Sequence, residues 1–119
     1  MTEIPAYQGS CHCGRVRFEL RAALDGIISC NCSHCARKGL LLTFVPAAAF
    51  TLLSGKDDLS EYRFNKHVIA HKFCNTCGVQ PFAYGAMPDG SAIRAINVRC
   101  LEGVDLDALP VRQVDGRSL

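Results

Sequence analysis

The segment KFCNTCGVQPF (Lys72–Phe82) contains a Cys-x-x-Cys pair that is followed directly by glycine. This pattern is typical of a zinc knuckle, in which glycine relieves crowding while backbone N–H groups turn toward the two sulfur atoms. A closed tetrahedral zinc site needs four ligands, so the knuckle supplies half of one. The pattern therefore predicts a second pair of cysteines elsewhere in the chain.

The second pair occurs in GSCHCGRVRFEL (Gly9–Leu20), where a single residue separates Cys11 from Cys13 and a glycine lies on either side of the pair. We predict that these thiols and the knuckle thiols Cys74 and Cys77 form one closed zinc site. Such a site ties the start of the chain to a segment about sixty residues later and contributes directly to folding. Free core cysteines have no reason to occur in such pairs. Iron is the alternative metal for four thiolates, and it would colour the protein.

The segment CNCSHC (Cys30–Cys35), which we interpret as a loop, places three further thiols within six residues. They can form a disulfide cluster, a closed structural site or an open metal site. A catalytic zinc commonly has three protein ligands and keeps its fourth position for water or substrate. The spacing therefore predicts an open second site of Cys30, Cys32 and Cys35. The residues that could instead close it as fourth ligand are His34, His67, His71 and Cys100.

The use of cysteine depends on the compartment. The start of the sequence, MTEIPAYQGS, has neither a basic region nor an apolar stretch of the kind that directs export, so we expect a cytoplasmic protein. Thiols are normally kept reduced there, which favours metal binding over disulfides for the eight cysteines. The most apolar stretch, Leu40–Leu53, is interrupted by polar residues and proline and is shorter than the roughly 20 residues of a membrane-spanning helix.

Length and composition indicate a single folded domain over residues 1–119. Hydrophobic residues make up 49% of the chain and charged residues 20%, which is ordinary for a globular protein. A net charge of +2 is too small to argue for nucleic acid as a partner. The sequence does not indicate an oligomeric state.

Alternation of apolar and polar residues predicts a mainly β structure. RVRFEL (Arg15–Leu20) places its valine, phenylalanine and leucine on one face, and AIRAINVRCL (Ala92–Leu101) alternates in a similar way. Helix is expected only in short pieces, one of them near Pro46–Phe50, where proline at a first turn precedes three alanines.

The order of the cysteine motifs resembles that of a known family. Gly-Ser-Cys-His-Cys-Gly, then Cys-x-Cys-x-x-Cys, then Phe-Cys-x-x-Cys-Gly is similar to the glutathione-dependent formaldehyde-activating enzymes, a family that includes relatives of centromere protein V. The resemblance runs from about Gly9 to Leu109. It implies the β-tent fold, a mainly β arrangement of small antiparallel sheets around zinc with little helix.

The resemblance also implies roles and a reaction. It assigns Cys11, Cys13, Cys74 and Cys77 to a structural zinc and Cys30, Cys32 and Cys35 to a second, substrate-facing zinc. The family's founding activity is a carbon–sulfur lyase reaction, the reversible condensation of glutathione with formaldehyde to S-hydroxymethylglutathione. The expected function is therefore zinc-dependent formation or cleavage of a glutathione–aldehyde adduct, and the alternative is a non-catalytic zinc scaffold that binds a protein.

Several side chains near the thiols have two interpretations each. His34 can donate to a bound oxyanion or close the zinc site, and it can equally be a solvated loop residue. Arg37 and Lys38 can bind the carboxylates of glutathione or form a solvated basic turn. For His71 we expect a hydrogen bond near the metal rather than direct ligation, and for Cys100 a buried apolar role. The aromatic residues that can wall a pocket, or pack in the core, are Phe44, Phe73, Phe82 and Tyr84.

Overall fold

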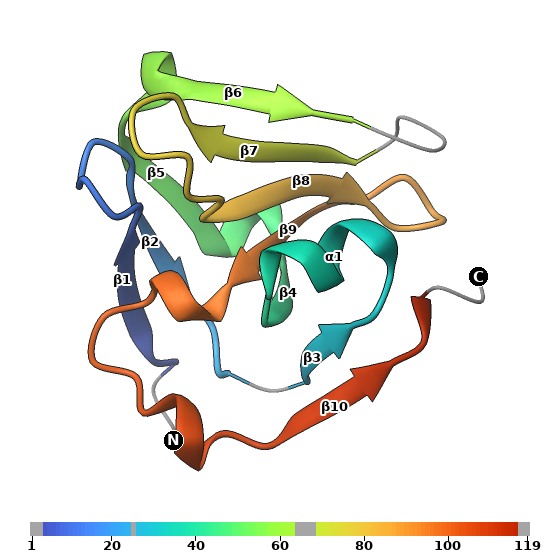
Figure 1. The fold of residues 1–119 in the computed structure, drawn as a ribbon. Helices are drawn as coiled ribbons and strands as arrows, with labels where there is room; N and C mark the ends of the chain where they lie inside the picture. The colour runs from blue at the N-terminus through green and yellow to red at the C-terminus, as the bar shows by residue number, and fades with distance from the viewer. Residues whose placement is uncertain (1–3, 25, 64–68, 117–119) are drawn as a thin grey trace.

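The structure is a computed structural model that describes residues 4–24, 26–63 and 69–116, and it contains two β-sheets (Figure 1). The smaller sheet has three strands in the order β1 (Ala6–Ser10), β2 (Arg17–Arg21), β5 (Phe50–Ser54). The larger sheet has seven strands in the order β10 (Val111–Val114), β3 (Ile27–Cys30), β4 (Leu42–Pro46), β9 (Ala92–Asn97), β8 (Phe82–Ala86), β7 (Ala70–Cys74), β6 (Leu59–Tyr62). The mainly β fold predicted from the sequence is confirmed.

Strand pairing is antiparallel in both sheets except at one edge of the larger sheet. There β10 runs parallel to β3, and Val114 is the register partner of Cys30. Figure 1 shows the two strands side by side, with the chain passing from β3 into the helix α1 (Ser33–Lys38). The end of the described chain therefore lies next to the segment that carries three of the cysteines.

Aromatic and aliphatic side chains from both sheets form the main core. Val16, Phe18 and Leu20 are fully buried, as their alternation predicted. The ring of Phe18 on β2 packs edge-on against that of Phe82 on β8, with a centroid distance of 5.5 Å. Phe50 on β5 contacts both rings, at 5.6 Å from Phe18 and 4.9 Å from Phe82. These aromatic contacts join the two sheets and should contribute several kcal/mol through apolar burial, at about 1.5–3 kcal/mol for each large side chain.

Two expectations about local structure change in detail. The segment Ala92–Leu101 does not form one strand, because the side chain of Asn97 accepts a hydrogen bond from the Arg99 N–H at 3.1 Å and starts a 3₁₀ helix (Val98–Cys100). Cys100 therefore lies in a helical turn rather than in a strand. The short helix expected near Pro46–Phe50 is present as a 3₁₀ helix over Ala47–Ala49. The other 3₁₀ helices cover Lys56–Asp58 and Leu106–Ala108.

The loop interpretation of CNCSHC is wrong, because the second half of this segment belongs to α1 and its first residue ends β3. The Sγ atom of Cys32 caps the helix by accepting a hydrogen bond from the Cys35 N–H at 3.4 Å. Gly39 ends the helix in a left-handed conformation with φ of 66°, and its N–H donates to the Cys35 carbonyl at 2.9 Å. No helix in the described ranges is long and apolar enough to cross a membrane.

Candidate metal centres

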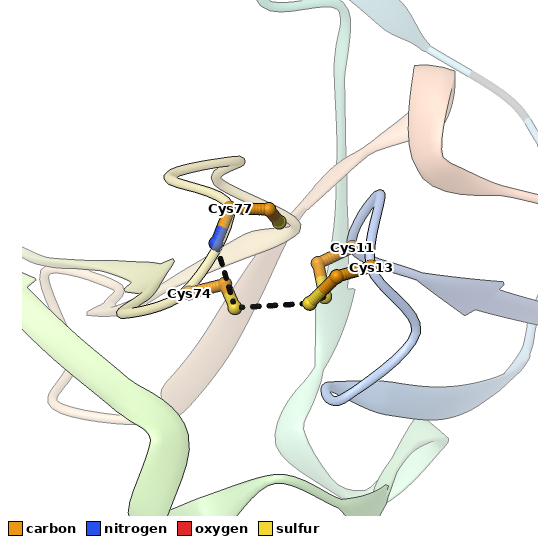
Figure 2. Close-up of side chains that lie close together, drawn as sticks. All are labelled: Cys11, Cys13, Cys74 and Cys77. Carbon is orange, nitrogen blue, oxygen red and sulfur yellow. Dashed lines mark hydrogen bonds between the residues drawn. The ribbon is translucent and has the colours of Figure 1, made fainter.

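The first centre lies where the two sheets meet. Cys11 and Cys13 are in the turn between β1 and β2, Cys74 is the last residue of β7, and Cys77 is in the turn that leads to β8. Figure 2 shows the first two cysteines facing the other two across the gap between these turns. The four Sγ atoms all lie within 4.8 Å of one another. A metal ion bound by all four would therefore connect the small sheet to the large one.

The sulfur spacing fits a tetrahedral ion. Zinc–sulfur bonds of about 2.3 Å give sulfur–sulfur edges of about 3.8 Å in a tetrahedron. The Cys13 Sγ lies 3.6 Å from the Cys11 Sγ and 3.6 Å from the Cys74 Sγ. A disulfide would instead hold two sulfurs at about 2.05 Å. All eight cysteines are free thiols in this structure, so the donor set is suited to a metal ion.

Backbone N–H groups prepare these thiols to act as ligands. The Thr76 N–H lies 3.3 Å from the Cys74 Sγ, and the Cys77 N–H lies 3.5 Å from the same atom. Burial alone would raise the pKa of Cys77, but hydrogen bonds from the backbone N–H groups of Val79 and Cys13 outweigh it and lower the pKa to about 6. Burial likewise acts to raise the pKa of Cys74, but hydrogen bonds from the backbone N–H groups of Cys77 and Thr76 outweigh it and lower the pKa. Cys74 and Cys77 therefore form thiolates readily, as metal ligation requires, whereas the pKa of Cys13 is raised to about 11.

Cys100 is close to this centre without belonging to it. It is half-buried against the core, and it is absent from the group of four whose sulfurs meet. Burial, together with the nearby thiolates of Cys11 and Cys77, raises the pKa of Cys100 to about 11. Cys100 therefore stays protonated at neutral pH and behaves as a small apolar residue, as expected.

The second centre consists of Cys30 at the end of β3, Cys32 at the helix cap and Cys35 inside α1. Their three Sγ atoms lie within 4.8 Å of one another. In the part of the chain that the structure describes, no further His, Cys, Asp or Glu lies within that mutual distance. His34, His71 and Cys100 are therefore not placed as a fourth ligand, and His67 lies outside the described residues. A metal ion held by these thiols would keep a position open.

The C-terminal segment covers one side of this second centre. The Asn31 N–H donates to the Val114 carbonyl at 3.1 Å, and the Asn31 side chain donates to the Asp115 carboxylate at 3.0 Å. These bonds bring Gly116 so close that a Cβ atom on it would overlap the Cys30 Sγ. Sequence reasoning missed Gly116, because nothing in the sequence around it indicates that β10 pairs with β3.

An apolar cavity of about 210 Å³ adjoins the three thiols. Its buried walls are Ile28, Leu40, Leu42, Ala83 and Ala95, which come from β3, β4, β8 and β9 and from the segment that follows α1. Phe44 and Ile69 also line it and are 48% and 47% exposed, so the cavity reaches solvent beside them. Phe44 is thus a pocket residue, whereas Phe82 packs in the core.

Two polar side chains enter this cavity, His71 and Gln80, which are 7% and 4% exposed. The Lys38 ammonium donates to the Gln80 Oε1 at 2.8 Å, which leaves the Gln80 amide NH₂ to face the His71 Nδ1 at 3.4 Å. An NH₂ group can only donate, so the His71 Nδ1 must accept and the ring proton is on Nε2. Burial, followed by the charges of His34 and Lys38, lowers the pKa of His71 to about 4.

This arrangement predicts the state of His71 in solution. Because its pKa is about 4, the ring stays neutral from pH 8 down to about pH 5 and gains its second proton only below that. We expect nitrogen NMR shifts of His71 to report the Nε2–H tautomer across that range, with assignment from the signal lost in His71→Asn. An Nδ1–H tautomer, or titration near pH 6.5, would contradict the hydrogen bond from Gln80.

A second, open pocket lies beside the His34 ring. Its lining consists of Ser33, His34, Arg37, Lys38 and Tyr62. The His34 ring lies 4.0 Å from that of His71 and 5.8 Å from that of Tyr62, between centroids, and is half-buried rather than solvated. Arg37 is exposed and donates to the Ser33 carbonyl at 2.9 Å. Both basic residues thus line this pocket, which we call the basic pocket, and their role in binding is a prediction.

Comparison with known proteins identifies similar sequences and structures. The family described as glutathione-dependent formaldehyde-activating enzyme matches residues 6–110 of this chain. A crystal structure of a Rhodobacter sphaeroides protein is similar with a TM-score of 0.78 and 29% sequence identity, covering 90% of this chain and 99% of that chain. The matched family region contains all eight cysteines and ends before β10.

Proposed function

Because the chain belongs to the family of glutathione-dependent formaldehyde-activating enzymes, we propose that it is a zinc-dependent carbon–sulfur lyase acting on glutathione–aldehyde adducts. The observation that carries this proposal is the second centre, where three thiols without a fourth donor in the described chain border a cavity. A purely structural ion would be closed by four ligands and would need no cavity. The proposed setting is the cytoplasm, where thiols stay reduced.

The two centres have different proposed roles. Cys11, Cys13, Cys74 and Cys77 would hold a structural zinc, because their sulfurs have tetrahedral spacing and join two sheets. Cys30, Cys32 and Cys35 would hold a second zinc with one open position. Zinc bound there favours the thiolate form of an incoming thiol, which is the nucleophile that aldehydes need.

The protein's own residues would bind the substrate and stabilise the charge that develops on the carbonyl oxygen. Arg37, exposed in the basic pocket, would bind a glutathione carboxylate. His71, held by Gln80 with its proton on Nε2, would donate a hydrogen bond from Nε2–H to the carbonyl oxygen and stabilise the negative charge that develops there as the carbon–sulfur bond forms. His34 packs against the His71 ring and would fix its orientation. The reaction is balanced, because the thiol proton ends on the former carbonyl oxygen and no oxidant or reductant is needed.

The proposal is tested by metal content and by rate. Reduced, freshly purified protein should contain about two zinc ions per chain, and X-ray absorption should show one additional sulfur ligand when glutathione is added. The same protein should accelerate adduct formation above the spontaneous rate for at least one aldehyde in a panel, and Cys32→Ser should abolish the acceleration. About one zinc per chain, no response to glutathione and no acceleration would instead favour a non-catalytic scaffold.

Arg37 gives a substrate-binding prediction. Arg37→Gln should raise the KM for glutathione about three- to tenfold and leave kcat unchanged, because it removes one partly exposed charged contact with a carboxylate. Steady-state kinetics with varied glutathione measures this. The control is Arg112→Gln, which removes an exposed arginine from β10, outside the pocket. Equal KM values for wild type and Arg37→Gln would exclude Arg37 as a glutathione ligand.

A further inference from the structure

The apolar cavity beside the second centre has no use in a reaction of formaldehyde. Formaldehyde has a single carbon, whereas the cavity volume is about 210 Å³. An apolar protein cavity of about 150 Å³ is large enough to bind benzene. The volume beside the thiols therefore accommodates an apolar group of about six carbons.

The cavity walls specify the chemistry of such a group. Ile28, Leu40 and Leu42 are buried and apolar, and so are the alanines of β8 and β9 that complete the wall. The polar side chains in the lining are His71 and Gln80, and Gln80 is already engaged by Lys38. A charged or strongly hydrated group would lose its water here without gaining partners, which is unfavourable. The cavity thus selects an alkyl or aryl substituent.

The two pockets divide an adduct between them. The basic pocket contains the cationic side chains of Arg37 and Lys38 and suits the two carboxylates of glutathione, while the apolar cavity excludes them. The rings of His34 and His71, which lie 4.0 Å apart between centroids and are tilted by 40°, lie at the boundary, since His34 lines one pocket and His71 the other. A glutathione sulfur bound beside Cys30, Cys32 and Cys35 can therefore place the peptide part of the adduct in the basic pocket and the aldehyde-derived part in the apolar cavity.

We propose that the aldehyde partner of this protein carries an apolar alkyl or aryl group of about four to seven carbons, which occupies the cavity lined by Ile28, Leu40, Leu42, Ala83 and Ala95. This inference rests on the proposed function and specifies its substrate class. In the reaction the thiol S–H bond and the carbonyl π bond break, the sulfur bonds to the aldehyde carbon, and the thiol proton ends on the oxygen as an O–H group. The substituent on that carbon occupies the cavity. Phe44 and Ile69, half-exposed at the rim, provide an apolar entrance.

Binding and rate can be measured separately. Zinc-loaded protein is titrated calorimetrically with S-methyl-, S-butyl-, S-hexyl- and S-benzylglutathione, which are stable analogues of the adduct. Affinity should rise about fourfold for each added methylene until the cavity is full. The rate of adduct formation with glutathione is measured for formaldehyde, propanal, pentanal and benzaldehyde, each divided by its spontaneous rate. The largest acceleration should occur with pentanal or benzaldehyde.

Cavity-filling variants identify the place of binding. Ala83→Leu and Ala95→Leu each add a large side chain to the wall and should remove the advantage of the long substituents, at least tenfold for S-hexylglutathione, while S-methylglutathione binds as before. Two positions are used because one of them could disturb folding, which circular dichroism reports. The matched control is Ala86→Leu, on the same strand β8 but exposed and outside the lining, and it should keep the wild-type preference.

The possible outcomes distinguish the proposed lyase function from the inferred apolar substrate class. Acceleration that is greatest for formaldehyde, with affinity independent of alkyl length, would overturn the inference and leave the proposed function standing. Absence of acceleration for every aldehyde, with affinity that still rises with alkyl length, would overturn the lyase function and keep the apolar ligand class. A length preference that survives in both cavity-filling variants would show that the substituent binds elsewhere and would overturn the inference.

Discussion

Cys74→Ser should unfold the chain or make it insoluble, and this is the largest effect we expect from a single substitution. Cys74 ends β7 and lies 3.6 Å from the Cys13 sulfur, so it belongs to the group of thiols that connects the two sheets. Structural zinc contributes about 10–16 kcal/mol in small zinc domains, whereas a whole domain is stable by about 5–15 kcal/mol. Losing one of four ligands should therefore remove most of the net stability.

The comparison with Cys32→Ser makes this result specific. Cys32 belongs to the second centre, so its replacement should remove about one zinc per chain and leave the fold intact. Cys100→Ser is the second control, because this half-buried thiol lies outside both groups and should cost neither zinc. Metal analysis, circular dichroism and urea unfolding with and without a chelator measure the three variants. Equal destabilisation by Cys74→Ser and Cys32→Ser would contradict the division into a folding site and an open site.

The features that could be predicted from the sequence are those in which neighbours in the chain act together. The knuckle Cys74–Cys77 needs only a short turn and a following glycine, and Gly78 has the left-handed conformation, with φ of 80°, that such a turn requires. The alternation from Val16 to Leu20 likewise depends on one strand with one buried face, and these side chains are buried. Local spacing in the sequence was therefore sufficient to predict both the mainly β fold and the grouping of the thiols.

Helix α1 could not be recognised, for a physical reason. It spans Ser33–Lys38, which is too short to show an apolar period, and such short helices depend on capping and tertiary contacts. Its cap is a cysteine sulfur on Cys32, a residue type that is not among the usual capping residues. Its tertiary contacts are also distant in sequence, since the His34 ring packs against that of His71 on β7. The sequence around the thiols contains none of this information.

The environment of the second centre depends on pairings that are distant in sequence. Gln80 faces His71 because the turn after the knuckle brings β8 back alongside β7, and Lys38 reaches Gln80 from α1. The cavity likewise exists only when β3, β4, β8 and β9 are assembled in their order. A sequence pattern specifies faces and turns but not which distant strands meet, so the contact of Gln80 with His71 and the full lining of the cavity could be identified only from the structure.

Gly116→Ala should weaken metal binding at the second centre and leave it unchanged at the first, although position 116 is outside the region that matches the family. A Cβ atom there would overlap the Cys30 sulfur and lie 3.3 Å from the Cys32 Cβ. The segment cannot easily retreat, because β10 is paired with β3 and the side chain of Asn31 donates to Asp115 at 3.0 Å. Either the Cys30 thiol turns away or the end of the chain separates from it, and both changes spoil the ligand geometry.

The expected loss is about 10–100-fold in affinity at the second centre, the range found when groups that support metal ligands are altered. Zinc competition with a chromogenic chelator measures both centres in one titration, and only the weaker step should shift. The matched control is Gly85→Ala, since a Cβ at Gly85 would meet Ile93 at an ordinary 3.7 Å and the backbone there is not left-handed. If Gly116→Ala binds two zinc ions as tightly as wild type, β10 is only an edge strand. If it loses the second zinc alone, this last strand is part of the open metal site.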